Sequence, residues 1–76
     1  MTLNEIQPKE ICVIVGLGRQ SILRKRIIDM GLTMQTRVKV VKLAPLGDPI
    51  EIEVRGYQLS LRKDEAKEIY VEKVHD

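Results

Sequence analysis

The sequence has few of the residues that support catalysis or metal binding. It has one cysteine, Cys12, so no disulfide can form within the chain, and a reducing compartment is expected. Its only histidine, His75, stands one residue from the C-terminus, which argues against a Ser-His-Asp triad or a Cys/His metal cluster. No apolar run approaches the roughly 20 residues that span a bilayer, and the start does not resemble a signal peptide. We therefore expect a cytoplasmic protein with no catalytic residues, no cofactor and no bound metal.

Aromatic residues are also scarce, since Tyr57 and Tyr70 are the only two. A groove for proline-rich peptides needs an aromatic lining, and single-stranded nucleic acid needs aromatic rings for its bases to stack on. Neither kind of site is expected. The "GLG" at 16–18 lacks the lysine and the further glycines of a phosphate-binding loop, so nucleotide hydrolysis is not expected either.

What the sequence does contain is typical of a small folded domain. Apolar residues make up 43% of the 76 residues and charged residues 32%, which favours one globular domain over residues 1–76. The charges are unevenly spread: residues 19–42 hold seven basic residues against Asp29 alone. Such a stretch favours a basic face for a nucleic acid, a lipid surface or an acidic protein, although it is equally typical of a solvated surface without a partner.

The first half of the chain predicts a strand and then a helix. In "KEICVIVGLG", Cys12 and Ile14 alternate with the other apolar residues, and Cys12 is interpreted as a packed hydrophobe rather than a reactive thiol. In "RQSILRKRIIDMGL", a stripe at helical spacing should face the core, and Gly31 should cap the helix in the left-handed conformation. The stripe consists of Leu23, Ile27 and Met30.

The second half predicts a series of short strands. "TRVKVVKL" alternates basic and apolar residues, and Ala44-Pro45-Leu46-Gly47 forms a turn that leads into a strand at 50–54. Arg55-Gly56 links that strand tightly to a strand at 57–61, whose Tyr57, Leu59 and Leu61 share one face, and a helical turn and a closing strand follow. Asp48, Glu51 and Glu53 are interpreted as a solvated surface rather than a metal site. The fold class is mainly β with short helices: a small SH3-like five-stranded barrel with one helix inserted after the first strand.

Three segments together resemble the FeoA family: "LRKRIIDMGL", "PLGDPIEIEV" and "RGYQLSLRKDEAKEIYV". The resemblance covers residues 3–74, and it rests on the order and spacing of the segments rather than on one motif. It implies an SH3-like domain that acts as a non-catalytic partner of FeoB, the GTP-hydrolysing membrane transporter of ferrous iron. It also implies a location in the cytoplasm, at the inner face of the membrane through that partner.

Two positions depart from the family's pattern. Lys9 stands where the family has a glycine, and Met34-Gln35 stands where it has Pro-Gly. Because a residue other than glycine disfavours positive φ, the connection at Gln35 is expected to differ from the family's.

Two groups of residues are candidates for binding the partner. The first is a basic face, which is continuous if the helix and the following strand pack side by side. The second is an apolar group near the helix end and the hairpin corner, and its alternative role is to cap the core. The basic residues are Arg24, Lys25, Arg26, Arg37 and Lys39; the apolar residues are Met30, Met34 and Leu46.

Two other functions remain open from the sequence. Similar domains follow the DNA-binding and dimerisation domains of DtxR-type metal-dependent regulators, so the chain could be a fragment of such a regulator. A small barrel associated with RNA or the ribosome is the other alternative, which the basic stretch favours and the lack of aromatic residues opposes.

Overall fold

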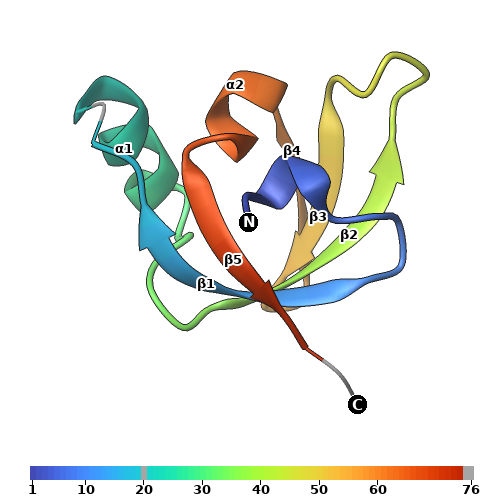
Figure 1. Ribbon diagram of the computed structural model, residues 1–76, viewed down its shortest axis with the longest axis horizontal. Helices are drawn as coiled ribbons and strands as arrows, with labels where there is room; N and C mark the ends of the chain where they lie inside the picture. Colours follow the sequence, from blue (N-terminus) through green and yellow to red (C-terminus); the bar gives the residue numbers. More distant parts are fainter. Residues whose placement is uncertain (20, 75–76) are drawn as a thin grey trace.

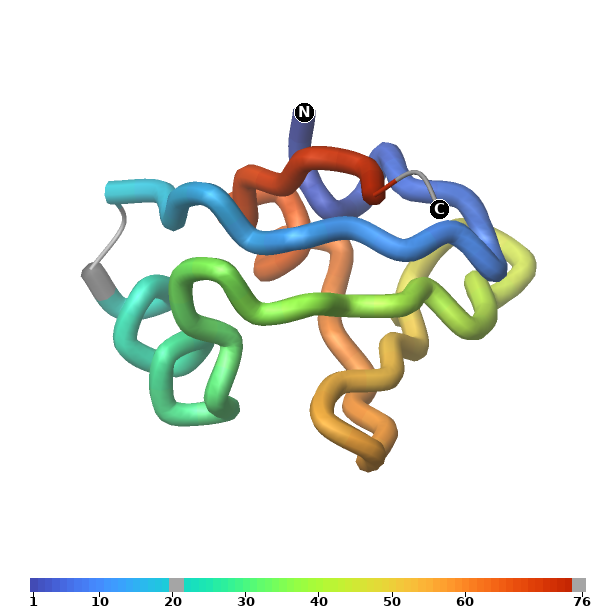
Figure 2. Tube along the Cα trace, turned by 90° about the horizontal axis from the view of Figure 1, so that it is seen from below, coloured from blue at the N-terminus to red at the C-terminus, as the bar shows by residue number. Residues whose placement is uncertain are grey.

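The structure, a computed structural model, describes residues 1–19 and 21–74, so Gln20 of the expected helix and the C-terminal His75 lie outside the described residues. Its five strands form one antiparallel sheet in the order β4-β3-β2-β1-β5, which curves into a small barrel (Figures 1 and 2). The strands are β1 (Ile11–Leu17), β2 (Arg37–Leu43), β3 (Ile50–Val54), β4 (Tyr57–Leu61) and β5 (Ile69–Lys73). Helix α1 (Ser21–Asp29) lies between β1 and β2, and the short helix α2 (Lys63–Ala66) between β4 and β5. The predicted five-stranded barrel with a helix after the first strand is confirmed.

The core follows the alternation in the sequence. Cys12 and Ile14 of β1 are completely buried, as are Val38 and Val40 of β2 and Ile52 of β3. In β2 the alternation slips by one residue after Val40, because Val40 pairs with Ile52 while Lys42 pairs with Glu51. This β-bulge is the reason that Arg37, Lys39 and Lys42 all point outward although their spacing is uneven.

The β3–β4 hairpin has the tight link that the sequence predicts. Arg55 and Gly56 both have positive φ, 50° and 85°, as a two-residue turn of this kind requires. Along β4 the burial falls off toward that turn: Leu61 is buried, Leu59 is half-buried and Tyr57 is 42% exposed. Tyr57 instead reaches the end of α1, where its hydroxyl donates to the Met30 carbonyl oxygen over 3.0 Å.

Helix α1 ends in a Schellman motif. Gly31 has φ +87°, its N–H donates to the Ile28 carbonyl, and the Leu32 N–H donates to the Ile27 carbonyl. Leu32 itself is completely buried. The predicted glycine cap is confirmed.

We expect Gly31→Val to lower the free energy of unfolding by about 1–2 kcal/mol, because valine strongly disfavours positive φ. In addition, a Cβ at this position would lie 3.1 Å from the Tyr57 hydroxyl. Gly47→Val is the matched control, since Gly47 has φ +80° but no atom within 4 Å of the added Cβ. Urea unfolding should show a cost for both variants and a larger one for Gly31→Val. A Gly31 variant as stable as the parent would contradict the cap.

The N-terminal segment contributes to the core, which the sequence analysis did not predict. A 3-10 helix, η1 (Leu3–Glu5), buries Leu3, and Ile6 just after it is 1% exposed. The N–H of Thr2 donates to Glu5 Oε1 over 2.8 Å, and this hydrogen bond lowers the pKa of Glu5. Residues 1–6 therefore help to close the barrel beside β5, where the Val71 N–H donates to the Met1 carbonyl oxygen.

Candidate docking surface

Helices α1 and α2 and the tip of the β2–β3 hairpin lie at the same end of the barrel, at the top of Figure 1. We call this the helical end. A cleft of about 510 Å³ opens there between α1 and α2. Ile22, one of the residues that line the cleft, is an apolar residue with 75% of its surface exposed. The residues that line the cleft are Ile22, Leu23, Arg26, Arg62, Asp64, Glu65, Lys67 and Glu68.

A buried carboxylate connects the two helices across this cleft. The Glu65 side chain is only 4% exposed, and its Oε2 atom lies 3.4 Å from a guanidinium nitrogen of Arg26, whose own side chain is 58% exposed. Glu65 Oε1 accepts the N–H of Arg62 over 2.9 Å, which satisfies a free N–H at the start of α2. Because Oε2 accepts no hydrogen bond from residues 1–19 and 21–74, Arg26 is what compensates there for the burial of this charge.

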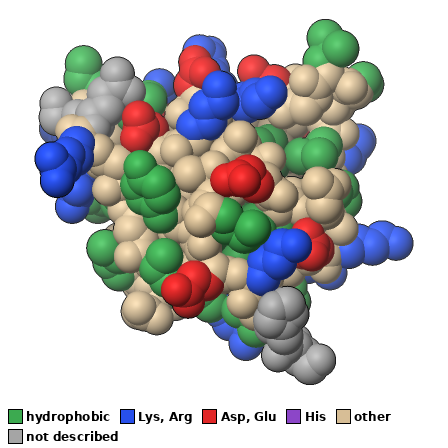
Figure 3. Space-filling view, in the orientation of Figure 1, with side chains coloured by type: hydrophobic (Ala, Val, Ile, Leu, Met, Phe, Trp, Pro, Cys, Tyr) green, Lys and Arg blue, Asp and Glu red, His purple; other side chains and the backbone are tan. Residues whose placement is uncertain are grey.

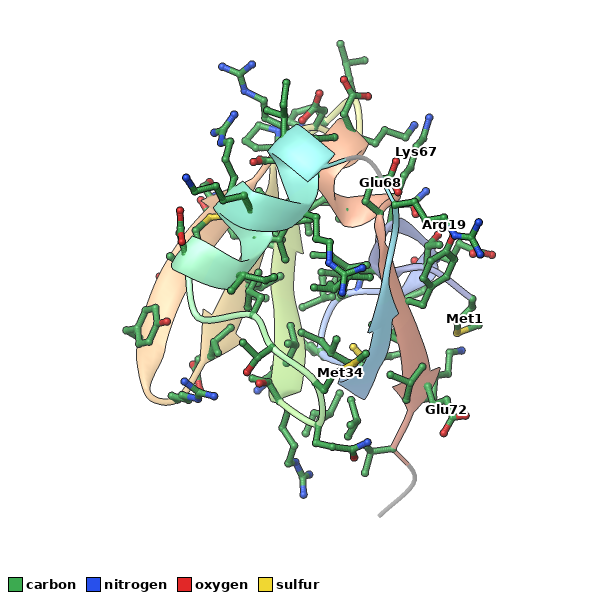
Figure 4. All side chains as sticks on the ribbon, turned by 90° about the vertical axis from the view of Figure 1, so that its left-hand side faces the viewer. Met1, Arg19, Met34, Lys67, Glu68 and Glu72 are labelled. Atoms are coloured by element: carbon green, nitrogen blue, oxygen red, sulfur yellow. The ribbon has the colours of Figure 1, made fainter. Side chains whose placement is uncertain are left out.

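The segment after β1 is held against the end of α2. The Gly18 N–H donates to the Glu68 carbonyl oxygen over 2.7 Å. A Cβ at Gly18 would meet the Glu68 carboxylate, so a larger residue here would require that side chain to move. Figure 4 shows Arg19, Lys67 and Glu68 together at this end of the molecule. Charges of both signs therefore surround the cleft.

The hairpin corner is fastened to α2. The turn from Ala44 to Gly47 is closed by the Gly47 N–H, which donates to the Ala44 carbonyl oxygen over 2.7 Å. Asp48 Oδ1 then accepts the N–H of Lys63, the first residue of α2, over 3.0 Å. This fixed corner presents Leu46, which is 90% exposed.

The predicted basic residues do not form one continuous face. Arg24, Lys25 and Arg26 are all exposed on α1, but only Arg26 turns toward the cleft. The neighbours of β2 in the sheet are β1 and β3, and Figure 1 shows most of β2 on the side of the barrel away from α1. The register also places Lys39 opposite Glu53 and Lys42 opposite Glu51, where opposite charges attract across the strands.

The apolar candidates are also separated. Met30 is half-buried and packs against the core, and its carbonyl oxygen accepts the hydrogen bond from the Tyr57 hydroxyl. Met34 is 53% exposed and lies beside β1, where the next residue, Gln35, donates its N–H to the Ile14 carbonyl oxygen (Figure 4). Leu46 belongs to the hairpin tip at the helical end, whereas Met30 follows the last residue of α1 and Met34 lies in the connection to β2. Docking through the eight predicted residues stays a prediction, and the cleft beside Ile22 was not predicted at all.

The described residues contain no group of three or more His, Cys, Asp or Glu side chains that could hold a metal ion. Within the same ranges no helix is long and apolar enough to cross a membrane. Cys12 is buried, as the sequence predicts, and its burial raises the pKa of the thiol to about 11.

The pKa of the Cys12 thiol is higher in the folded state than in the unfolded state. The stability that this difference contributes is therefore fully present below the ordinary thiol pKa of about 9, and it is lost as pH rises toward the folded-state pKa of about 11. We expect Cys12→Val to flatten the decline in urea midpoint between about pH 8 and pH 11. The parent and the variant share every other titrating group, so the difference between their curves isolates the thiol. Parallel curves would contradict the burial of Cys12.

Comparison with protein families decides what this domain is. A model of the FeoA domain matches residues 1–73. The chain belongs to the FeoA family. A solved FeoA-like protein from Clostridium acetobutylicum is 42% identical, covers 100% of this chain and 88% of its own, and superimposes with a TM-score of 0.93. FeoA from Stenotrophomonas maltophilia, determined with zinc and described as an SH3 domain protein, is 25% identical and covers 95% of this chain and 89% of its own, with a TM-score of 0.82. The predicted SH3-like fold is confirmed.

A third relative joins FeoA to a transporter. An Fe(2+) transport protein A/Fe(2+) transporter FeoB fusion protein from Porphyromonas gingivalis is 38% identical over 72 residues. The match covers 95% of this chain and 8% of the fusion protein. The likeness is therefore to one small part of a much longer protein.

The two departures from the FeoA pattern have a common structural result. Lys9 has φ 75° and Gln35 has φ 67°, so both take the left-handed conformation that glycine adopts most easily. The expectation that positive φ would be lost at Gln35 is wrong. Hydrogen bonds hold both segments: the Lys9 N–H donates to the Val40 carbonyl oxygen and the Gln35 N–H to that of Ile14, each over 2.7 Å.

Proposed function

We propose that this chain is a non-catalytic accessory domain of ferrous iron uptake that binds and modulates a FeoB-type GTP-hydrolysing membrane transporter. The observation that carries the proposal is the fusion relative, in which a sequence 38% identical to this chain is joined to FeoB. A domain can bind a transporter either from a separate polypeptide or from the same polypeptide, where the linkage raises its effective concentration. The domain would then work at the cytoplasmic face of the membrane.

The helical end has the properties of a docking surface. Ile22, which lines the cleft, is 75% exposed, and Leu46 at the hairpin tip is 90% exposed, so the helical end presents two aliphatic side chains to solvent. Arg26, Arg62 and Lys67 at the cleft would set mainly the rate of association with an acidic surface. Segments from α1, α2 and the hairpin all contribute, so the surface exists only in the folded barrel.

We expect Ile22→Asp and Leu46→Asp each to weaken binding to detergent-solubilised FeoB by about tenfold or more, the cost of losing an apolar anchor. Met34→Asp introduces the same charge at an exposed side chain away from the helical end and should change the affinity less than twofold. Immobilised FeoB with and without a GTP analogue, titrated with each variant, measures the affinities. Equal binding by all three variants would contradict docking at the helical end, and no binding by the parent would contradict the proposed function.

The RNA-associated alternative is not favoured by the structure. Lys39 and Lys42 face Glu53 and Glu51 across the sheet, so β2 does not present the uninterrupted positive surface on which RNA-binding proteins rely.

A further inference from the structure

The side of α1 that faces away from the barrel combines cations with an exposed isoleucine. At 3.6 residues per turn, Arg24, Ile28 and Lys25 fall within an arc of roughly 100°, with Ile28 between the two cations. Ile28 is 42% exposed, and Arg24 and Lys25 are also exposed. Figure 4, which looks onto this side, shows α1 in front of the barrel. In Figure 3 the edge of the molecule where α1 lies carries basic, acidic and hydrophobic side chains. We call these three residues the outer stripe of α1.

The cations of the outer stripe outnumber the acidic residue beside them, Asp29, which stands one helical turn after Lys25. Among the residues that the structure describes, neither Arg24 nor Lys25 has an ion-pair partner, whereas Arg26 on the cleft side is paired with Glu65. Asp29 is the one acidic residue of α1, and residues 11–28 contain none. The stripe therefore has an excess of positive charge around an apolar side chain.

We propose that the outer stripe contacts the headgroup region of an anionic lipid bilayer. Lysine and arginine beside such a surface are attracted to it, and an isoleucine between them can enter the boundary of the acyl chains while the long cationic side chains reach the phosphates. A protruding helix fits a flat, deformable lipid surface without a complementary groove. The stripe is on a different side of α1 from Ile22 and the cleft, so lipid contact and transporter docking do not compete for the same residues.

The contact is weak and reversible, because α1 has only nine residues and the stripe has only one apolar side chain. For its place in the cell the inference rests on the proposed function, since binding to FeoB would keep the domain near the membrane. The physical contact itself does not need FeoB. It can therefore be tested with the isolated protein, and its failure is separate from the failure of transporter docking.

The test is co-sedimentation of the full chain with vesicles of equal parts phosphatidylglycerol and phosphatidylcholine, against vesicles of phosphatidylcholine alone. We expect binding to the anionic vesicles only, and a strong decrease when salt rises from about 0.05 M to 0.5 M. Each cation removed should lower the partition coefficient about fivefold, so Arg24→Gln combined with Lys25→Gln should lower it roughly 20-fold or more. Ile28→Ser should lower it by several fold at unchanged net charge.

The matched control is Lys39→Gln combined with Lys42→Gln, which removes the same charge from β2. It should lower the partition coefficient much less than the α1 pair. An equal loss in the control, or no binding of the parent to anionic vesicles, would overturn the proposal. Binding to FeoB that depends on Arg24 and Lys25, without binding to vesicles, would assign the stripe to the transporter instead. Circular dichroism and urea unfolding establish that each variant is folded.

Discussion

We expect Ile52→Ala to lower the free energy of unfolding by about 2–4 kcal/mol, the usual cost of truncating a large aliphatic side chain in a packed core. Ile52 is completely buried at the centre of β3, between Val40 on β2 and Leu59 on β4. The barrel has 76 residues and one core cluster, so there is little surrounding structure that could collapse into the space.

Urea unfolding followed by circular dichroism measures this loss. Ile28→Ala is the control: it removes the same atoms from a side chain that is 42% exposed and should cost less than about 1 kcal/mol. An unchanged midpoint for Ile52→Ala, or equal costs for both variants, would mean that the strand register is wrong.

We expect Arg26→Glu to lower the free energy of unfolding by about 2–3 kcal/mol. The substitution removes the only ionic partner of Glu65 among the described residues and adds a second carboxylate next to the Glu65 side chain, which is 4% exposed. Removing one partner of a fully buried ion pair typically costs about 3–5 kcal/mol, and the 58% exposure of the Arg26 side chain reduces this figure because water screens the pair.

Arg24→Glu is the matched control, because it makes the same change in charge two residues away on the same helix. It should change stability by less than about 0.5 kcal/mol, since Arg24 is exposed and has no ion-pair partner among the described residues. The sequence alone does not distinguish the two arginines, because both belong to the predicted basic face. Equal stability of the two variants would support that simpler interpretation. Arg26→Gln, which lacks the added repulsion, should lie between the parent and Arg26→Glu.

Much of the fold could be predicted because its signals are local. The alternation of apolar and charged residues from Ile50 to Val54 fixes which face of β3 is buried, and Gly31 marks the end of α1 through its conformational freedom. The positive φ of Lys9 and Gln35 could not be predicted in this way. There, hydrogen bonds to other segments of the barrel impose a conformation that the residues themselves disfavour.

The docking surface was harder to predict because it depends on contacts between distant parts of the chain. Glu65 lies in "RKDEAKE", a stretch that predicts a helical turn, and its burial depends on contacts of α2 with distant parts of the chain, among them the ion pair with Arg26 of α1. The cleft beside Ile22 has the same origin. The N-terminal segment did have a local signal that could have been used, since Thr2 and Glu5 stand at the spacing of a capping box, with Leu3 and Ile6 as apolar residues three apart.

The hydrogen bond from the Lys63 N–H to Asp48 Oδ1 gives the hairpin corner a spectroscopic reporter of its own. Exchange of this one amide proton with deuterium requires the corner to separate from α2, so its rate measures how often the corner opens in the native state. A ligand that holds Leu46 should slow the exchange at Lys63. A ligand bound elsewhere should leave that rate unchanged while it slows exchange in the strands through global stabilisation. Binding of a ligand to the corner between Leu43 and Ile50 can therefore be measured at a single backbone amide, that of Lys63.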